Sequence, residues 1–266
     1  MLRSVFAKVL HDQWRVLAIW TALSALLAGF YLSLYPSIGA VEETRKMLES
    51  MPPAVRAMFV TEGSDISTPA GYLNVELFTF VVPLLVLAIT LTGAAGATAG
   101  EEERGTMELL LANPIPRWRV VLEKFAAVGV LSGALCVGIW IALGITAGLS
   151  GIDIRLDRVA AAMVSAWLLG MAVGAAALAL GAVTGNRMLS IGVALGIAVA
   201  GFFVNALAPL AELLRPWRPF SPHYHYLGYD PLANGLDLSH AAVLAGATVV
   251  LVVIAAVAFE RRDLHA

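Results

Sequence analysis

The stretch VAAAMVSAWLLGMAVGAAALALGAVTGN, residues 159–186, contains no Asp, Glu, Lys or Arg. A helix needs roughly 20 mainly apolar residues to cross the ~30 Å hydrocarbon core of a bilayer. A strand of a membrane barrel would be only about 9–11 residues long and would alternate in polarity. This stretch therefore predicts a membrane-spanning helix.

Five further runs without a charged residue cover 16–41, 77–100, 125–152, 188–211 and 241–259. Only 14% of the 266 residues are charged, whereas a soluble domain carries about 25%. This pattern excludes a soluble enzyme, a disordered chain and a fibrous protein. We expect an all-α, polytopic membrane protein forming a single transmembrane domain over 1–266. Its six spans would lie at about 16–38, 77–99, 125–150, 159–184, 188–210 and 241–259.

The segments outside these spans carry weaker patterns. Residues 1–15 place their apolar side chains on one helical face, which predicts a helix lying on the membrane surface rather than a plain polar tail. Residues 41–76 predict one or two short helices, interrupted at Pro52 and Pro53. Residues 212–240 form a second sizeable segment, rich in proline and aromatic residues.

The distribution of positive charge predicts the orientation of the chain in its membrane. Six spans leave both termini on one side. If that side is the cytoplasm, the inner segments hold ten of the 17 Lys and Arg residues, in agreement with the positive-inside rule. Segment 100–124 is then cytoplasmic, and segments 41–76 and 212–240 are outside.

The chain shows no energy source of its own. Ion-coupled carriers usually keep ionisable residues at membrane depth, and the predicted spans contain none. A P-loop for ATP requires Lys followed by Ser or Thr, and none of Lys8, Lys46 and Lys124 is followed so. We therefore expect no cofactor in this chain, and any transport would need ATP hydrolysed by a separate subunit.

Segment 100–124, GEEERGTMELLLANPIPRWRVVLEK, is suited to receive a push from such a subunit. Thr106 can cap a short helix that carries Glu108 in its positive first turn. Pro114 ends that helix, and Pro116 starts the helix that continues into the third span. An ordinary interfacial loop with an acidic patch is the alternative.

The same segment resembles a known family. Permease subunits of type-2 ATP-binding-cassette (ABC) exporters share a pattern between their second and third spans. It consists of an acidic pair, Gly-Thr, a Leu-rich turn, a small residue before proline, and then Arg and Lys. This chain carries that pattern from Glu101 to Arg117 and at Lys124. The segments 67–73, 221–235 and 259–264 also resemble the corresponding parts of the family.

The resemblance implies a set of functional elements. Residues 1–15 would be an elbow helix, 101–117 the coupling segment that docks on the ATPase, and 212–240 short outer re-entrant helices that help to close the pathway. The ATPase-coupling residues would be Glu102, Glu103, Gly105, Thr106, Glu108, Leu110, Leu111, Pro114 and Arg117. The outer gate segment would include Pro222, His223, Tyr224, Asp230 and Pro231.

The resemblance also implies partners and a function. Two cassette ATPase subunits, which bind ATP and Mg, would act with two permease subunits, identical or homologous, in a prokaryotic inner membrane. The permease would not itself be an enzyme, and it would export a hydrophobic or amphipathic compound such as a drug, an antibiotic or a lipid. The alternative is a membrane subunit for mechanical work or copper-enzyme maturation, without bulk export.

Small residues at four-residue spacing predict close helix packing. On the fifth span Gly192, Gly196 and Ala200 form such a series. It indicates either a dimer seam or packing within one subunit, and the spacing does not distinguish them.

Other chemistries have weak support. His223 and His225 form a pair without a third metal ligand, so we expect no metal site. Ser132, Ser165 and Ser190 have no His at membrane depth to activate them, which argues against an intramembrane enzyme. A net charge of −2 suggests no nucleic-acid partner.

Overall fold

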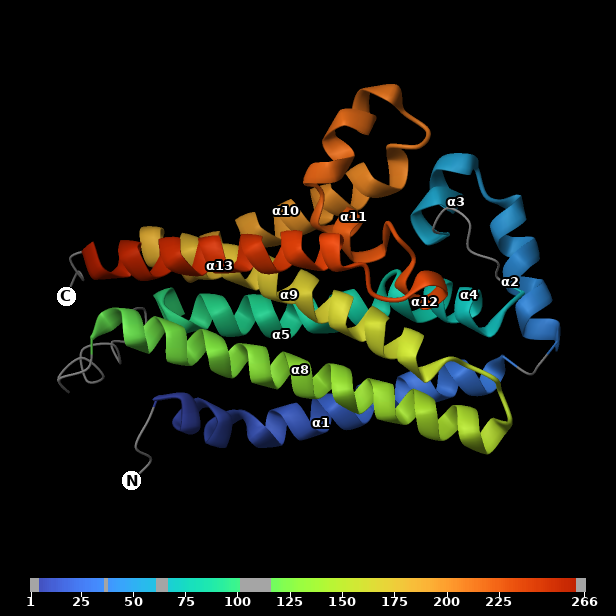
Figure 1. Cartoon of the computed structure of the whole chain (residues 1–266), viewed down its shortest axis with the longest axis horizontal. Helices are drawn as coiled ribbons and strands as arrows, with labels where there is room; N and C mark the ends of the chain where they lie inside the picture. The colour runs from blue at the N-terminus through green and yellow to red at the C-terminus, as the bar shows by residue number, and fades with distance from the viewer. Residues whose placement is uncertain (1–4, 36–37, 61–66, 101–115, 262–266) are drawn as a thin grey trace.

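The computed structural model describes residues 5–35, 38–60, 67–100 and 116–261, and every regular element within these ranges is helical (Figure 1). Six helical segments are long and apolar enough to cross a membrane. They are α1 (Val5–Leu34), the segment Pro69–Ala97, α8 (Arg117–Ser150), α9 (Leu156–Thr184), α10 (Arg187–Leu207) and α13 (Leu238–Arg261). The expected all-α architecture with six spans is confirmed.

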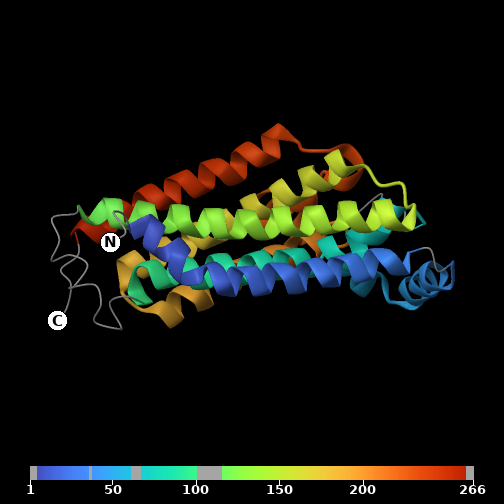
Figure 2. The ribbon, with the colours of Figure 1, turned by 90° about the horizontal axis from the view of Figure 1, so that it is seen from below.

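Helix α9 forms the centre of the bundle. It is the most buried of the six spans, and it packs against α5 (Val81–Ala97), α8, α10 and α13. The helix α1 lies at the periphery and packs mainly on α8 (Figures 1 and 2). Close contact between α5 and α9 depends on glycine. A Cβ atom at Gly174 of α9 would lie only 3.0 Å from the Cβ of Thr90 of α5.

Four helix ends meet at one end of the bundle. The start of α1, the end of α5, the start of α8 and the end of α13 all lie on the left in Figure 1. The connection between α8 and α9 lies at the opposite end. Segment 101–115 joins α5 to α8, so both of its attachment points are at the end where α1 begins.

Short helices follow the first span and precede the last one, as predicted for residues 41–76 and 212–240. Helices α2 (Ile38–Ser50) and α3 (Pro53–Phe59) follow α1 and are separated at Met51 and Pro52. Before the last span lie η2 (Glu212–Phe220), α11 (Pro222–Leu227) and α12 (Pro231–Asn234). Both α11 and α12 pack against α9.

The second span begins earlier than the expected residue 77. It consists of α4 (Pro69–Leu73), the π-helical turn η1 (Asn74–Phe78) and α5. Thr68 caps α4 by accepting a hydrogen bond from the Gly71 N–H at 3.1 Å, and Pro69 occupies the first helical position. Both residues suit a helix start, which explains why the helix extends beyond the charge-free run.

Two other expected boundaries are wrong. Helix α8 begins at Arg117 rather than 125, because no helix breaker follows Pro116 until Gly129. Helix α1 runs without interruption from Val5, so no boundary separates an elbow helix at 1–15 from a span beginning at 16. The stretch from Val5 to Ala28 contains neither Pro nor Gly, and its first turns are inclined to the rest of the helix (Figure 2).

Candidate functional site

Most of the predicted coupling residues lie outside the described residues. These are Glu102, Glu103, Gly105, Thr106, Glu108, Leu110, Leu111 and Pro114. Arg117 is described and is the first residue of α8, preceded by Pro116 in an extended conformation (φ −58°, ψ 138°) as its N-cap. The site can therefore be built from the residues that immediately follow the coupling segment.

The first turn of α8 is joined to the end of α13. The Trp118 N–H donates to the Glu260 carboxylate at 3.2 Å. N–H groups in the first turn of a helix have no partner within the helix, and the positive helix end favours an anion there. Glu260 of α13 thus provides a hydrogen-bond partner for an N–H group in the first turn of α8.

The second turn of α8 is joined to the start of α1, and here the carboxylate belongs to α8. Glu123 accepts a hydrogen bond from the Phe6 N–H at 3.2 Å and forms an ion pair with Arg119 at 2.8 Å. One carboxylate therefore binds the positive end of α1 and a side chain of its own helix.

Lys124 joins α8 to the end of α5. Its side chain is buried, and its Nζ donates to the Ala97 carbonyl oxygen at 3.2 Å. Carbonyl groups in the last turn of a helix lack partners within the helix, and the negative helix end favours a cation. We call the contacts of Trp118, Glu123 and Lys124 with α13, α1 and α5 the α8 junction. A displacement of the α8 start acts directly on three other spans.

At the other end of the bundle, the predicted gate residues anchor the segment before α13. Ser221 caps α11, donates its hydroxyl to the Gly201 carbonyl at 2.7 Å, and places Pro222 at the first helical position. Asp230 caps α12 and has a left-handed backbone conformation (φ 47°), and Pro231 follows it at the first helical position. Tyr224 is partly buried against His225 and His240.

This anchored segment is tied to the π-helical turn of the second span. The buried Asn74 donates to the Asp230 carboxylate at 3.1 Å, and the Tyr226 hydroxyl donates to the Phe78 carbonyl at 2.8 Å. Irregular backbone at membrane depth requires such partners, because an unpaired carbonyl there is costly. The segment before α13 and the π-helical turn η1 therefore provide hydrogen-bond partners for each other.

His223 is buried between the rings of Phe202 and Tyr226, and burial lowers the pKa of its imidazole to about 4. His225 contacts His240 with 3.0 Å between their Nδ1 atoms. Within the described residues, no group of three or more His, Cys, Asp or Glu side chains is placed to hold a metal ion.

The series of small residues predicted on the fifth span lies on the outer face of α10. Gly192, Gly196 and Ala200 are exposed, and a Cβ at either glycine would meet no atom within 4 Å. The inner face of α10 instead presents Ala194 and Ala198. Gly192, Gly196 and Ala200 therefore do not contribute to helix packing within the subunit.

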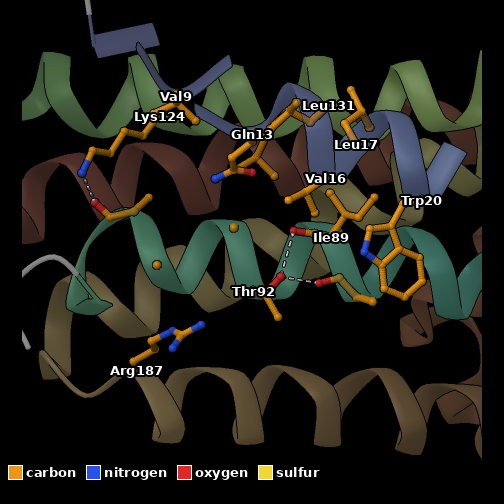
Figure 3. A pocket seen from close by; sticks show the side chains of 15 residues that line it. Val9, Gln13, Val16, Leu17, Trp20, Ile89, Thr92, Lys124, Leu131 and Arg187 are labelled. Atoms are coloured by element: carbon orange, nitrogen blue, oxygen red, sulfur yellow. Dashed lines mark hydrogen bonds between the residues drawn. The ribbon is translucent and has the colours of Figure 1, made fainter. Parts of the chain in front are cut away.

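From the sequence, Lys124 is found only as part of the family pattern, without its hydrogen bond to Ala97 (Figure 3). Nothing in the sequence predicts the contacts of Glu123 and Glu260, because residues 100–124 and the end of the chain are expected to lie in the cytoplasm. For Lys124 a signal was present. Lys124 lies four residues from both Val120 and Val128, so helical spacing places it on a buried face.

Comparison with known proteins gives the family. A family model described as ABC-2 family transporter protein matches residues 3–264. The probable ABC transporter permease protein NosY of Stutzerimonas stutzeri is 32% identical over 175 residues, covering 64% of this chain and 61% of that protein. Its namesake in Pseudomonas aeruginosa is 34% identical over 185 residues, covering 68% and 65%. The match thus spans less than two thirds of either relative. The chain belongs to the ABC-2 family of transporter proteins, the permease subunits of ABC transporters.

Proposed function

We propose that this chain is the permease subunit of an ATP-driven exporter in a prokaryotic inner membrane, with both termini in the cytoplasm. It carries a hydrophobic or amphipathic compound across the bilayer. Two cassette ATPase subunits bind ATP and Mg²⁺ and supply the energy. Membership of the ABC-2 family and six apolar spans support this assignment.

The α8 junction is the observation that carries the proposal. Segment 101–115 leads directly into α8, and the first two turns of α8 hold α1, α5 and α13 through Glu123, Lys124 and Trp118. Helices are stiff elements that move as units. When an ATPase pushes on the coupling segment, four spans shift together, and the pathway changes the side to which it is open.

A second permease subunit completes the unit in this proposal. The exposed small residues Gly192, Gly196 and Ala200 let two α10 helices approach closely, and the pathway lies between the two subunits.

The same junction would serve a mechanical role without export, because it transmits movement whatever the cargo. Stimulation of the ATPase by a transported compound favours export. ATPase coupling without any compound crossing the membrane favours the mechanical role.

A charge reversal in the coupling segment tests the proposal. Glu108→Lys is expected to abolish stimulation of the partner ATPase in the reconstituted complex while leaving membrane insertion intact. Asp153→Lys is the matched control, since Asp153 is exposed and belongs to the connection between α8 and α9, which lies at the opposite end of the bundle. Normal ATPase coupling and normal assembly with Glu108→Lys would count strongly against the assignment.

A further inference from the structure

Two histidines join the segment before α13 to α13 itself. His225 lies on α11 and His240 in the first turn of α13, and the two helices pack against each other (Figure 1). The Nδ1 atoms of the two rings are 3.0 Å apart. The other ring nitrogen of His225, Nε2, lies 2.8 Å from the carbonyl oxygen of Pro219 in η2. A chain of hydrogen bonds therefore runs from η2 through α11 to α13.

The Pro219 carbonyl fixes the positions of the protons on both rings. A carbonyl oxygen only accepts, so Nε2 of His225 carries a hydrogen atom and donates it. In a neutral imidazole the other nitrogen is then an acceptor. Nδ1 of His225 therefore accepts from the Nδ1–H of His240. The bond between the rings forms because only one of the two facing nitrogens carries a hydrogen atom.

This chain tolerates one added proton but not two. A first proton on Nδ1 of His225 is accommodated when His240 carries its hydrogen on Nε2 and accepts with Nδ1. When both imidazoles are protonated, each Nδ1 carries a hydrogen atom. Two donors and two positive charges then face each other at 3.0 Å, so no hydrogen bond is possible and the charges repel.

Two tyrosines enclose the pair without adding charge. The Tyr224 ring contacts both imidazoles, at centroid distances of 5.2 Å to His225 and 5.1 Å to His240. The Tyr229 ring stacks on His240 at 6.4 Å. Phenols are uncharged at neutral and acidic pH. The two rings therefore shield the pair from water but do not determine its charge.

Charged groups of both signs lie near the pair. Asp237 accepts from the His240 backbone N–H at 3.0 Å, whereas the Arg218 guanidinium of η2 lies over the Tyr224 ring. From α9, Arg158 reaches Gly235, and the only ionisable residue of α10 is Arg187, at the start of that helix. The carboxylate favours a charged histidine and the arginines oppose it.

The pair takes up its second proton only below the usual range of histidine. Burial lowers the pKa of His225, the hydrogen bond to the Pro219 carbonyl opposes this lowering, and the charge of His240 adds to it. An isolated histidine titrates at about 6.5, and two coupled groups release their protons in separate steps. The contact between the rings is therefore stable at neutral pH and is lost as the pH falls below this range.

We propose that His225 and His240 form a proton-operated clamp, which is closed while at most one imidazole is protonated and open when both are. The open clamp frees η2 and α11 from the start of α13, while Ser221 still holds α11 to α10 through the Gly201 carbonyl. Acidification on that side of the membrane would then loosen the outer gate segment. The clamp follows from the contacts alone, whereas its exposure to the outer compartment rests on the proposed topology.

Hydrogen exchange followed by mass spectrometry tests the clamp, with the full chain purified in a neutral maltoside detergent. His240→Asn keeps the clamp closed, because an amide can donate to Nδ1 of His225 or accept from it. At pH 4.5, residues 212–227 should exchange about threefold to tenfold faster in the wild type than in His240→Asn, the factor that corresponds to one hydrogen bond. At pH 7.5 the two proteins should exchange alike.

His225→Gln gives the opposite pattern. Its amide can still donate to the Pro219 carbonyl but offers no imidazole Nδ1 to His240. Residues 212–227 of this variant should exchange faster than those of the wild type at pH 7.5 and equally fast at pH 4.5. His11→Asn is the control, since His11 is exposed on α1, and its exchange should match the wild type at both pH values. If the ratio of variant to wild-type exchange is the same at both pH values in His240→Asn and in His225→Gln, the proposal is wrong.

Nitrogen magnetic resonance of histidine-labelled protein tests the proton positions directly, and the two variants assign the signals. At pH 7.5 we expect hydrogen on Nε2 of His225 and on Nδ1 of His240, and at pH 4.5 on every nitrogen of both rings. A His240 ring that carries its hydrogen on Nε2 at pH 7.5 would contradict the chain of hydrogen bonds. Neither experiment involves an ATPase or a cargo, so its outcome is independent of whether the chain is an exporter.

Discussion

Glu123 joins two helices through one carboxylate, which accepts from the Phe6 N–H of α1 and pairs with Arg119 of α8. A carboxylate at a helix N-terminus combines a capping hydrogen bond with a favourable charge–dipole interaction. This residue therefore fixes the position of the α1 start relative to α8.

Glu123→Ala is expected to lower the free energy of unfolding by about 1–2 kcal/mol, because the start of α1 loses its cap. Unfolding in detergent, followed by tryptophan fluorescence, measures the change. Glu49→Ala is the control: it removes an exposed i,i+4 pair with Arg45, and exposed ion pairs contribute little to stability. Equal losses in the two variants would contradict the role of Glu123.

His223 should make stability depend on pH. Its pKa is about 4 in the folded protein, against about 6.5 in an unfolded chain. Between these values the unfolded state binds a proton that the folded state does not, so stability falls as the pH drops from 6.5 toward 4, by at most about 1.4 kcal/mol per pH unit. Above pH 6.5 the imidazole is neutral in both states and contributes no such penalty.

His223→Leu should remove this part of the pH dependence. The measurement is the difference in unfolding free energy between wild type and variant at pH 7.5 and at pH 5, in which the contributions of other groups cancel. A difference that is the same at both pH values would show that His223 does not titrate as described.

At the scale of elements, six spans could be predicted from charge-free runs, because a charged side chain is costly in the hydrocarbon core. The ends of the spans could not be predicted in this way, because a helix can continue past a charged residue when nothing breaks its backbone hydrogen bonds. Arg side chains can also extend their heads from an apolar surface to water, so α8 includes Arg117 and Arg119, while the buried Lys124 is accommodated by the Ala97 carbonyl. The π-helical turn at Asn74–Phe78 is fixed by Tyr226, a partner 148 residues away that local patterns do not reveal.

The contact between α5 and α9 should be sensitive to a single methyl group. A Cβ at Gly170 would overlap the Val86 side chain, so Gly170→Ala is expected to cost about 1–3 kcal/mol of unfolding free energy. Gly148→Ala on α8, where a Cβ meets no atom within 4 Å, should be neutral or stabilising by up to about 1 kcal/mol. Thermal unfolding of the two variants side by side provides the comparison, and similar melting temperatures would contradict the prediction.

The outer face of α10 should control self-association. Two copies of this chain are proposed to meet along α10, and Gly196→Leu is then expected to convert that dimer to monomers, because a bulky side chain prevents close approach of two helices. Light scattering during size-exclusion chromatography in detergent measures the mass. Gly246→Leu, equally open on α13, should leave the dimer intact; a Gly196→Leu dimer would place the seam elsewhere.

At the scale of the whole molecule, the orientation can be tested with single cysteines. Cys136 is the only cysteine and is buried, so a Cys136→Ala background is suitable. In intact cells, an impermeant maleimide should label Asp153→Cys. It should label Leu110→Cys only after permeabilisation. Labelling of residue 110 from outside would overturn the proposed topology.

The central place of α9 has a consequence for how the protein is made. The helix that contacts α5, α8, α10 and α13 is the fourth of six to leave the ribosome. Until it is inserted, α1 and α8 can pair, but the face of α5 that packs on the glycines of α9 has no partner. We therefore expect assembly to wait for residue 184, and nascent chains released before that point to be recognised by membrane quality control.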